Sequence, residues 1–104
     1  MECLKRLYGR AVIDNSDSEE IKEDCRLELE YYRLKSKTTG KPYGIEIVKK
    51  NIQDNQINIE KKKIYNISYK EENTNRLLDI MINNKVTPVS VEDIIHDLTI
   101  IKVI

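Results

Sequence analysis

Apolar and polar residues alternate through the first two-thirds of the chain in a way that is typical of half-buried β-strands. Leu27, Leu29 and Tyr31 alternate with charged residues, which is the period of two of a strand with one buried face. A second alternating run begins at Tyr43, after the turn-forming segment Thr38–Pro42. The two runs predict a β-hairpin.

The residues beside this hairpin extend the sheet. Tyr32 and Leu34 have the opposite parity, which predicts a bulge near the two adjacent tyrosines. The segment from Glu2 to Ile13 fits a strand or a short helix, and a strand ending near Ile13 is the preferred interpretation. The acidic stretch from Asp14 to Asp24 is interpreted as a loop.

A third strand is predicted after a polar turn over Asn51–Asn55. Its apolar residues share one parity, and we expect them to face the same side of the sheet: Ile57, Ile59, Tyr65 and Ile67.

The period changes to that of a helix after Ile67. Ser68 and Glu71 have the spacing of a capping box, and a helix starting there should end near Asn83 and Asn84, ahead of Pro88. The apolar stripe of this helix is Thr74, Leu77, Leu78 and Met81.

A second helix is predicted from Ser90, which stands three residues before Asp93. Its stripe is Val91, Ile94, Ile95, Leu98 and Ile101. Strands followed by helices indicate the α+β class. We therefore predict one domain over residues 1–104, partly flexible over residues 1–24: an antiparallel three- to four-stranded meander covered on one face by two C-terminal helices.

The charges are segregated along the chain, although the net charge is zero. Residues 31–70 hold ten basic and three acidic side chains, whereas the segments before and after them are net acidic. A basic sheet between acidic flanks favours binding of an acidic partner.

Nothing in the sequence resembles a signal peptide or a membrane span, and Cys3 and Cys25 are too few for a disulfide scaffold. We expect two reduced, buried thiols in a cytoplasmic protein.

Candidate chemistry is sparse. The only histidine, His96, lies near Glu92, Asp93 and Asp97 at helical spacing, which is a loose version of a metal site and equally a solvated helix face. Neither cysteine has a nearby activating base in the sequence. We assign no catalytic residue, metal, cofactor or small-molecule substrate, and we expect a protein that is not an enzyme.

A protein-interaction or regulatory module, with a protein partner or a second copy bound, is the leading hypothesis. The alternative is an anion or nucleic-acid binder that uses the basic central sheet of residues 31–70. The apolar C-terminal tail packs on the domain or on a partner. The candidate partner surface comprises Tyr32, Lys49, Lys50, Lys61, Lys62, Lys63, Ile101 and Ile104.

Two tracts resemble a family of small clostridial proteins of unknown function. The tract Tyr43–Lys50, preceded by two tyrosines, is similar to one part of that family, and Asn84–Val89 with the helix that follows is similar to its C-terminal end. The resemblance spans about residues 27–98 and implies a cytoplasmic protein from a low-GC, spore-forming bacterium. Its motifs are structural: Gly44 suits a close backbone approach and Pro88 suits a fixed turn. It implies no active site.

Overall fold

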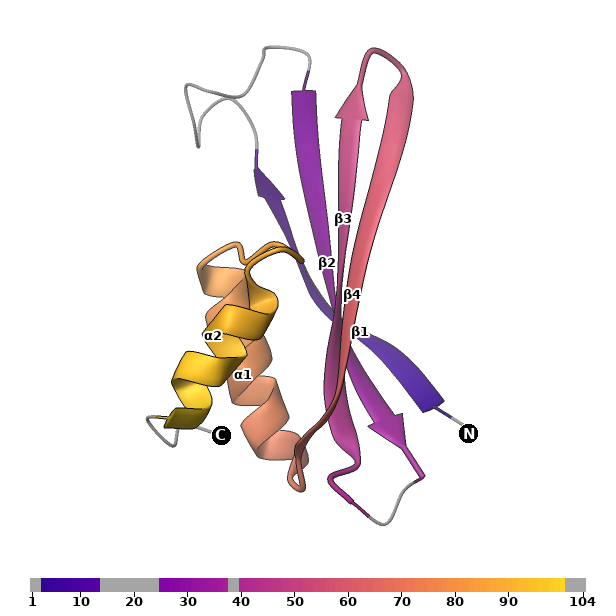
Figure 1. The fold of residues 1–104 in the computed structure, drawn as a ribbon. Coiled ribbons are helices and arrows are strands. Elements are labelled where there is room, and N and C mark those ends of the chain that lie inside the picture. The colour runs from indigo at the N-terminus through magenta and orange to yellow at the C-terminus, as the bar shows by residue number, and fades with distance from the viewer. Residues whose placement is uncertain (1–2, 14–24, 38–39, 101–104) are drawn as a thin grey trace.

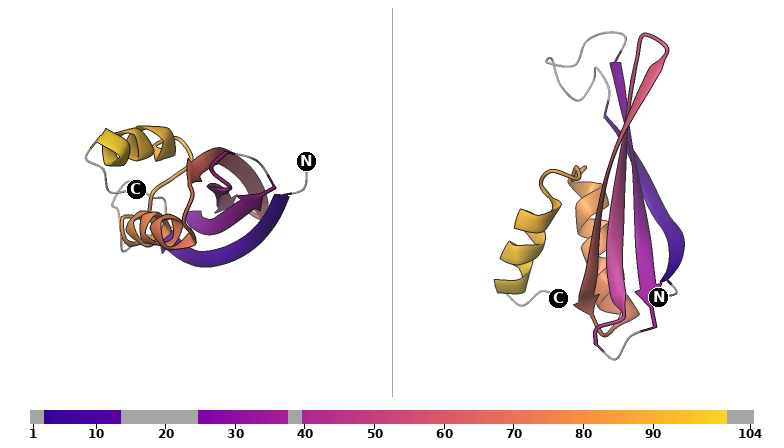
Figure 2. Two further views of the ribbon diagram at one scale, coloured as in Figure 1. Left: turned by 90° about the horizontal axis from the view of Figure 1, so that it is seen from below. Right: turned by 45° about the vertical axis from the view of Figure 1, so that its right-hand side comes forward.

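The fold is a four-stranded antiparallel sheet followed by two helices on one side of it (Figure 1). The structure is a computed structural model and describes residues 3–13, 25–37 and 40–100. The strands lie side by side in chain order and twist about one another along their length (Figure 2). This arrangement confirms the predicted α+β meander with two C-terminal helices. The elements are β1 (Cys3–Ile13), β2 (Cys25–Ser36), β3 (Tyr43–Gln53), β4 (Gln56–Ser68), α1 (Glu71–Asn83) and α2 (Val91–Ile100).

The core lies between the sheet and α1, which contacts all four strands. The predicted stripe of α1 is confirmed, since its four members are all fully buried. Val91 at the start of α2 is also fully buried. The strands contribute Leu29, Tyr31, Ile45, Ile47 and Ile67 to the same core.

The structure shows where α1 begins and where it ends. The helix begins after Lys70 rather than after Ser68, whose hydroxyl oxygen accepts the Lys70 N–H at 3.1 Å. The predicted capping box is therefore wrong, because Ser68 still belongs to β4. The predicted end at Asn83 is confirmed, and Lys85 then turns the chain with a φ of 50°. As predicted, α2 starts directly after Ser90.

The turn between β3 and β4 is shorter than expected. Both strands pair to the end, with Gln53 opposite Gln56. Only Asp54 and Asn55 form the turn, and their φ values of 51° and 66° are in the left-handed region that short polar side chains tolerate. The prediction of a turn starting at Asn51 is wrong, because polar residues in that stretch belong to a paired strand.

The apolar residues of β4 do not share one face. Ile57 and Ile59 pair with Ile52 and Lys50 on the side away from the helices, whereas Ile67 is buried in the core. The single-parity prediction is wrong because a bulge near Asn66, where φ is 58°, changes the direction of the side chains.

Gly44 allows this bulge. Its neighbours Tyr43 and Ile45 pair with Ser68 and Ile64, so the pairing shifts around the glycine. A Cβ atom at Gly44 would lie 2.3 Å from the Ile64 carbonyl oxygen. The close backbone approach expected at this glycine is confirmed.

A second bulge lies in β1, where the pairing shifts between Leu7 and Gly9. Leu7 is opposite Tyr32 and Gly9 is opposite Tyr31. The bulge expected near the two tyrosines is therefore on the neighbouring strand, and β2 itself pairs without interruption with β3. The extra residue, Tyr8, donates a hydrogen bond from its hydroxyl to Asp79 of α1 at 2.8 Å.

Several predictions concern residues that the structure does not describe. The acidic loop from Asp14, the turn residues Thr38 and Thr39, and the tail residues Ile101 and Ile104 lie outside the described residues. Cys3 is a free thiol as expected, but it is exposed at the end of an edge strand, so the expectation that it is buried is wrong.

Candidate functional site

The two helices leave one face of the sheet uncovered, and we call this the open face. Side chains that are paired across strands point to the same face, so the register assigns its members. Among the described strands, the open face carries six basic and three acidic side chains: Lys5, Arg10, Arg26, Lys50, Lys61 and Lys63, with Glu28, Glu30 and Glu46.

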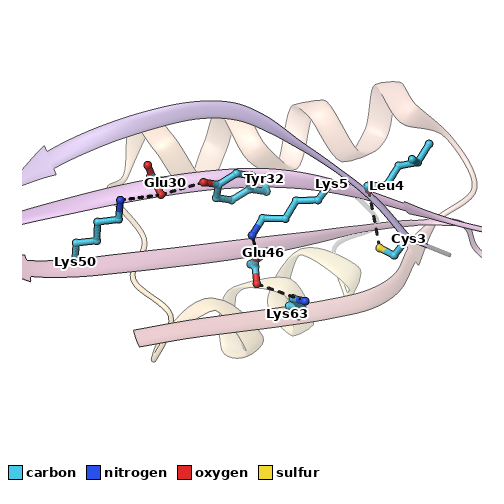
Figure 3. Close-up of polar contacts among 8 residues, drawn as sticks. All are labelled: Cys3, Leu4, Lys5, Glu30, Tyr32, Glu46, Lys50 and Lys63. Carbon is cyan, nitrogen blue, oxygen red and sulfur yellow. Dashed lines mark hydrogen bonds and ion pairs between the residues drawn. The ribbon is translucent and has the colours of Figure 1, made fainter. Parts of the chain in front are cut away.

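Glu46 is at the centre of the open face. Its side chain is only 1% exposed, although it points away from the hydrophobic core. Lys5 from β1 and Lys63 from β4 extend toward Glu46 from the two edge strands, as Figure 3 shows. Lys5 forms a close ion pair with one carboxylate oxygen, and the Lys63 ammonium lies 3.9 Å from the other. The two lysines therefore provide the counter-charge of a carboxylate that water does not reach.

Glu30 is a second carboxylate of the open face that contacts cations, and Figure 3 shows its contact with Lys50. Lys50 Nζ lies 3.5 Å from its Oε1 atom, and Arg10 Nε lies 3.8 Å from its Oε2 atom. The Tyr32 hydroxyl donates a hydrogen bond to Glu30 at 2.9 Å, and the Lys5 ammonium lies 4.2 Å from the centroid of the Tyr32 ring. Tyr32 thus links the two carboxylate clusters into one network across all four strands.

Two groups of this network have a raised pKa, Lys5 and Tyr32. The hydrogen bond to Glu46 raises the pKa of Lys5, so the ammonium stays charged. Burial, followed by the hydrogen bond to Glu30, raises the pKa of Tyr32, so its phenol stays neutral. At neutral pH the open face therefore presents the charged Lys5 ammonium beside a neutral Tyr32 phenol.

The structure separates the predicted partner residues between the two faces. Tyr32, Lys50, Lys61 and Lys63 are on the open face. Lys49 and Lys62 are on the helix-facing side. Their ammonium groups lie 3.8 Å from Glu60 and 2.6 Å from Glu92, respectively. The lysines of the central segment therefore do not form one continuous basic surface.

Four members of the network were not among the predicted partner residues: Lys5, Arg10, Glu30 and Glu46. Lys5 was missed because the bulge at Tyr8 breaks the alternation of β1. The sequence of β1 therefore does not show on which face of the sheet each side chain lies. Glu30 was missed because an isolated glutamate in an alternating strand is the usual pattern of a solvated face. Glu46 alternates with the apolar residues Ile45 and Ile47, a pattern typical of a solvated face, and it is instead buried.

His96 is exposed on α2. In the part of the chain that the structure covers, no three histidine, cysteine or acidic side chains are close enough together to hold a metal ion. Neither of the two described helices is long and apolar enough to cross a membrane.

Comparison with known proteins identifies a family without a known role. No curated protein and no solved structure matches the chain. A family model described as a family of unknown function (DUF6514) matches residues 10–100. This match extends further toward the N-terminus than the expected resemblance over residues 27–98. Because it covers most of the 104 residues, the chain belongs to this family of unknown function.

Proposed function

We propose that the chain is a non-enzymatic, cytoplasmic protein-interaction module that binds an acidic protein through the open face of its sheet. The observation that supports this most is the uncovered face itself, on which basic side chains outnumber acidic ones by six to three over the described strands. An excess of positive charge on a fixed surface attracts and orients a negatively charged partner.

Apolar side chains flank the charges of the open face. Leu7 on β1, and Ile57 and Ile59 on β4, are 41%, 60% and 53% exposed, and all three are on this face by register. Exposed apolar groups beside an ordered polar network resemble the mixed composition of transient protein interfaces. Burying these three side chains against a partner would add affinity that charges alone do not provide.

A different protein fits this face better than a second copy does. Two open faces placed together would bring one positive surface against another. Pairing of two β4 edges would place Lys61, Lys62 and Lys63 near the same residues of the other copy, and like charges across strands are destabilising. A homodimer is therefore the weaker alternative.

Binding of nucleic acid is also less favoured than binding of an acidic protein. Binding of a phosphate backbone needs a continuous track of free cations. On the open face, Lys5 and Lys63 already neutralise Glu46, and the Tyr32 ring that would stack on a base is covered by the Lys5 ammonium.

Site-specific crosslinking tests the proposal. A photoreactive residue replaces Ile59 on the open face, and a matched control replaces Glu72, which is exposed on α1. In cells that produce the protein, we expect adducts of one acidic protein from position 59 and none from position 72. Lys61→Glu should abolish the adduct, whereas Arg76→Glu on α1 should not.

The proposal fails if both positions give the same adducts, or if the adduct from position 59 survives Lys61→Glu. An adduct with twice the mass of the chain would show self-association and would also refute a different acidic partner. Gel-shift with mixed RNA and DNA at low salt tests the nucleic-acid alternative, and a shift that Lys61→Glu removes would favour it.

A further inference from the structure

We infer that a small pocket between the β1–β2 edge and the start of α1 binds a phosphate group. The pocket has a volume of about 320 Å³, which is the lower end of the size range of small-molecule sites. It is lined by Leu4, Lys5, Arg6, Arg33, Lys35 and Glu71.

Positive charge accumulates at this pocket. Arg6 and Arg33 are directly opposite each other in the β1–β2 pairing, and Lys35 follows two residues later on the same face. Like charges that are directly opposed across strands are destabilising unless an anion lies between them. Among the lining residues that the structure describes, Glu71 is the only acidic one, and it pairs with Arg33.

Two contacts with α1 fix the position of the Arg33 side chain at one side of the pocket. Its Nη2 atom lies 2.8 Å from a Glu71 carboxylate oxygen, and its Nη1 atom donates to the Asn75 amide oxygen at 2.8 Å. The side chain is 15% exposed. Because both contacts come from the first turns of α1, they fix the guanidinium between helix and sheet.

Of the other three cations of the pocket, Lys5 pairs with Glu46, whereas Arg6 and Lys35 are not matched by acidic groups. Arg6 is exposed and has no ion pair or hydrogen bond with any described residue. Lys35 is exposed as well, and its one described contact is with the Tyr43 ring, 5.7 Å from the centroid. Two unneutralised positive charges beside a fixed guanidinium match a phosphate dianion better than a carboxylate.

The start of α1 favours the same ligand. No side chain caps this end of the helix, and Glu71 is in its first turn, so the positive end of the helix dipole lies beside the pocket. This contribution adds to the side-chain cations and is not needed to define the site.

The three cations that would hold the phosphate are separate from the proposed partner surface. Arg6, Arg33 and Lys35 are on the helix-facing side of the sheet, opposite the open face. Lys5 is the one lining residue that also belongs to the open face, so substitutions of Arg6 and Lys35 leave the partner surface intact and the two proposals can fail separately.

Titration calorimetry at constant ionic strength tests the inference, with inorganic phosphate and phenyl phosphate as two ligands and acetate and chloride as controls. We expect one phosphate bound per chain and no binding of acetate or chloride. Arg6→Gln and Lys35→Gln should each weaken binding about tenfold, the loss expected for one charge-assisted hydrogen bond. Arg26→Gln removes an exposed cation on the open face and should leave the affinity unchanged.

Glu71→Gln is the sharpest variant, because it removes the only acidic group that competes with the ligand for Arg33. We expect it to tighten phosphate binding several-fold. Tighter binding of phenyl phosphate than of inorganic phosphate would identify a phosphate ester as the source of the group, and the reverse would identify the free ion. Absence of binding by both, equal effects of Arg6→Gln and Arg26→Gln, or weaker binding by Glu71→Gln would each overturn the inference.

Discussion

Substituting each of the three glycines with alanine tests how the backbone of this sheet is held. At Gly44, the added Cβ would lie 2.3 Å from the Ile64 carbonyl oxygen and 3.0 Å from the Tyr65 Cα atom, whereas ordinary contacts begin at 3.4 Å. Both obstructing atoms belong to the backbone, so β4 must move away by roughly 1 Å and the paired bulge must open.

We expect Gly44→Ala to destabilise the fold by about 3 kcal/mol, the upper part of the usual range for overpacking. In a domain of this size, such a loss lowers the melting temperature by roughly 15 °C. Gly9→Ala meets the Ile82 Cδ1 atom at 2.6 Å, but this atom is the end of a flexible side chain that can rotate, at a cost of about 1 kcal/mol. Gly40→Ala meets nothing within 4 Å and should change stability by less than about 0.5 kcal/mol.

Thermal and urea denaturation followed by circular dichroism measure the three variants under one set of conditions. The reasoning predicts a graded order in which Gly44 is the most sensitive position and Gly40 the least. If Gly44→Ala were within 1 kcal/mol of Gly40→Ala, the close approach between β3 and β4 would be refuted.

Three further predictions concern buried polar groups. Replacing both Lys5 and Lys63 by methionine leaves the Glu46 carboxylate buried without cations and should cost about 3–5 kcal/mol in urea denaturation. Glu46→Gln should cost about 1 kcal/mol or less, because the half-exposed lysines can turn to water, and equal losses in both variants would contradict this asymmetry. Tyr31→Phe removes the hydrogen bond to the buried Val86 carbonyl and should destabilise by about 1–2 kcal/mol, more than Tyr32→Phe. Burial raises the pKa of Tyr31 above the ordinary 10.0, so the unfolded chain releases this proton first. The contribution of this phenol to stability should therefore be constant below pH 10.0 and be lost as the pH rises above it. A melting temperature that stays level well above that pH would count against the buried phenol.

The sequence was sufficient for the elements whose pattern is local. The alternation in β2 and the helical stripe from Thr74 to Met81 each predict their own burial, because every residue of the pattern follows one period. The order of the strands follows from the same patterns, since short connections join antiparallel neighbours.

The sequence was not sufficient where one residue changes the direction of those after it. The bulge near Asn66 turns Ile67 into the core although Ile57 and Ile59, which have the same parity, lie on the open face, and neither the positive φ nor the shifted pairing is visible in a list of apolar residues. The same limit applies to the candidate sites. Lys5 and Lys63 are on opposite edges of the sheet, and only the completed fold brings both to Glu46.

The β3–β4 hairpin extends past the ends of the helices (Figure 1), and residues 54–61 around its tip are all exposed. The backbone amides near Asp54 are therefore protected mainly by their own pairing, whereas those near Ile45 are also covered by α1. We expect hydrogen exchange to slow progressively from the tip toward the covered end, so that the hairpin opens reversibly at its outer end without global unfolding.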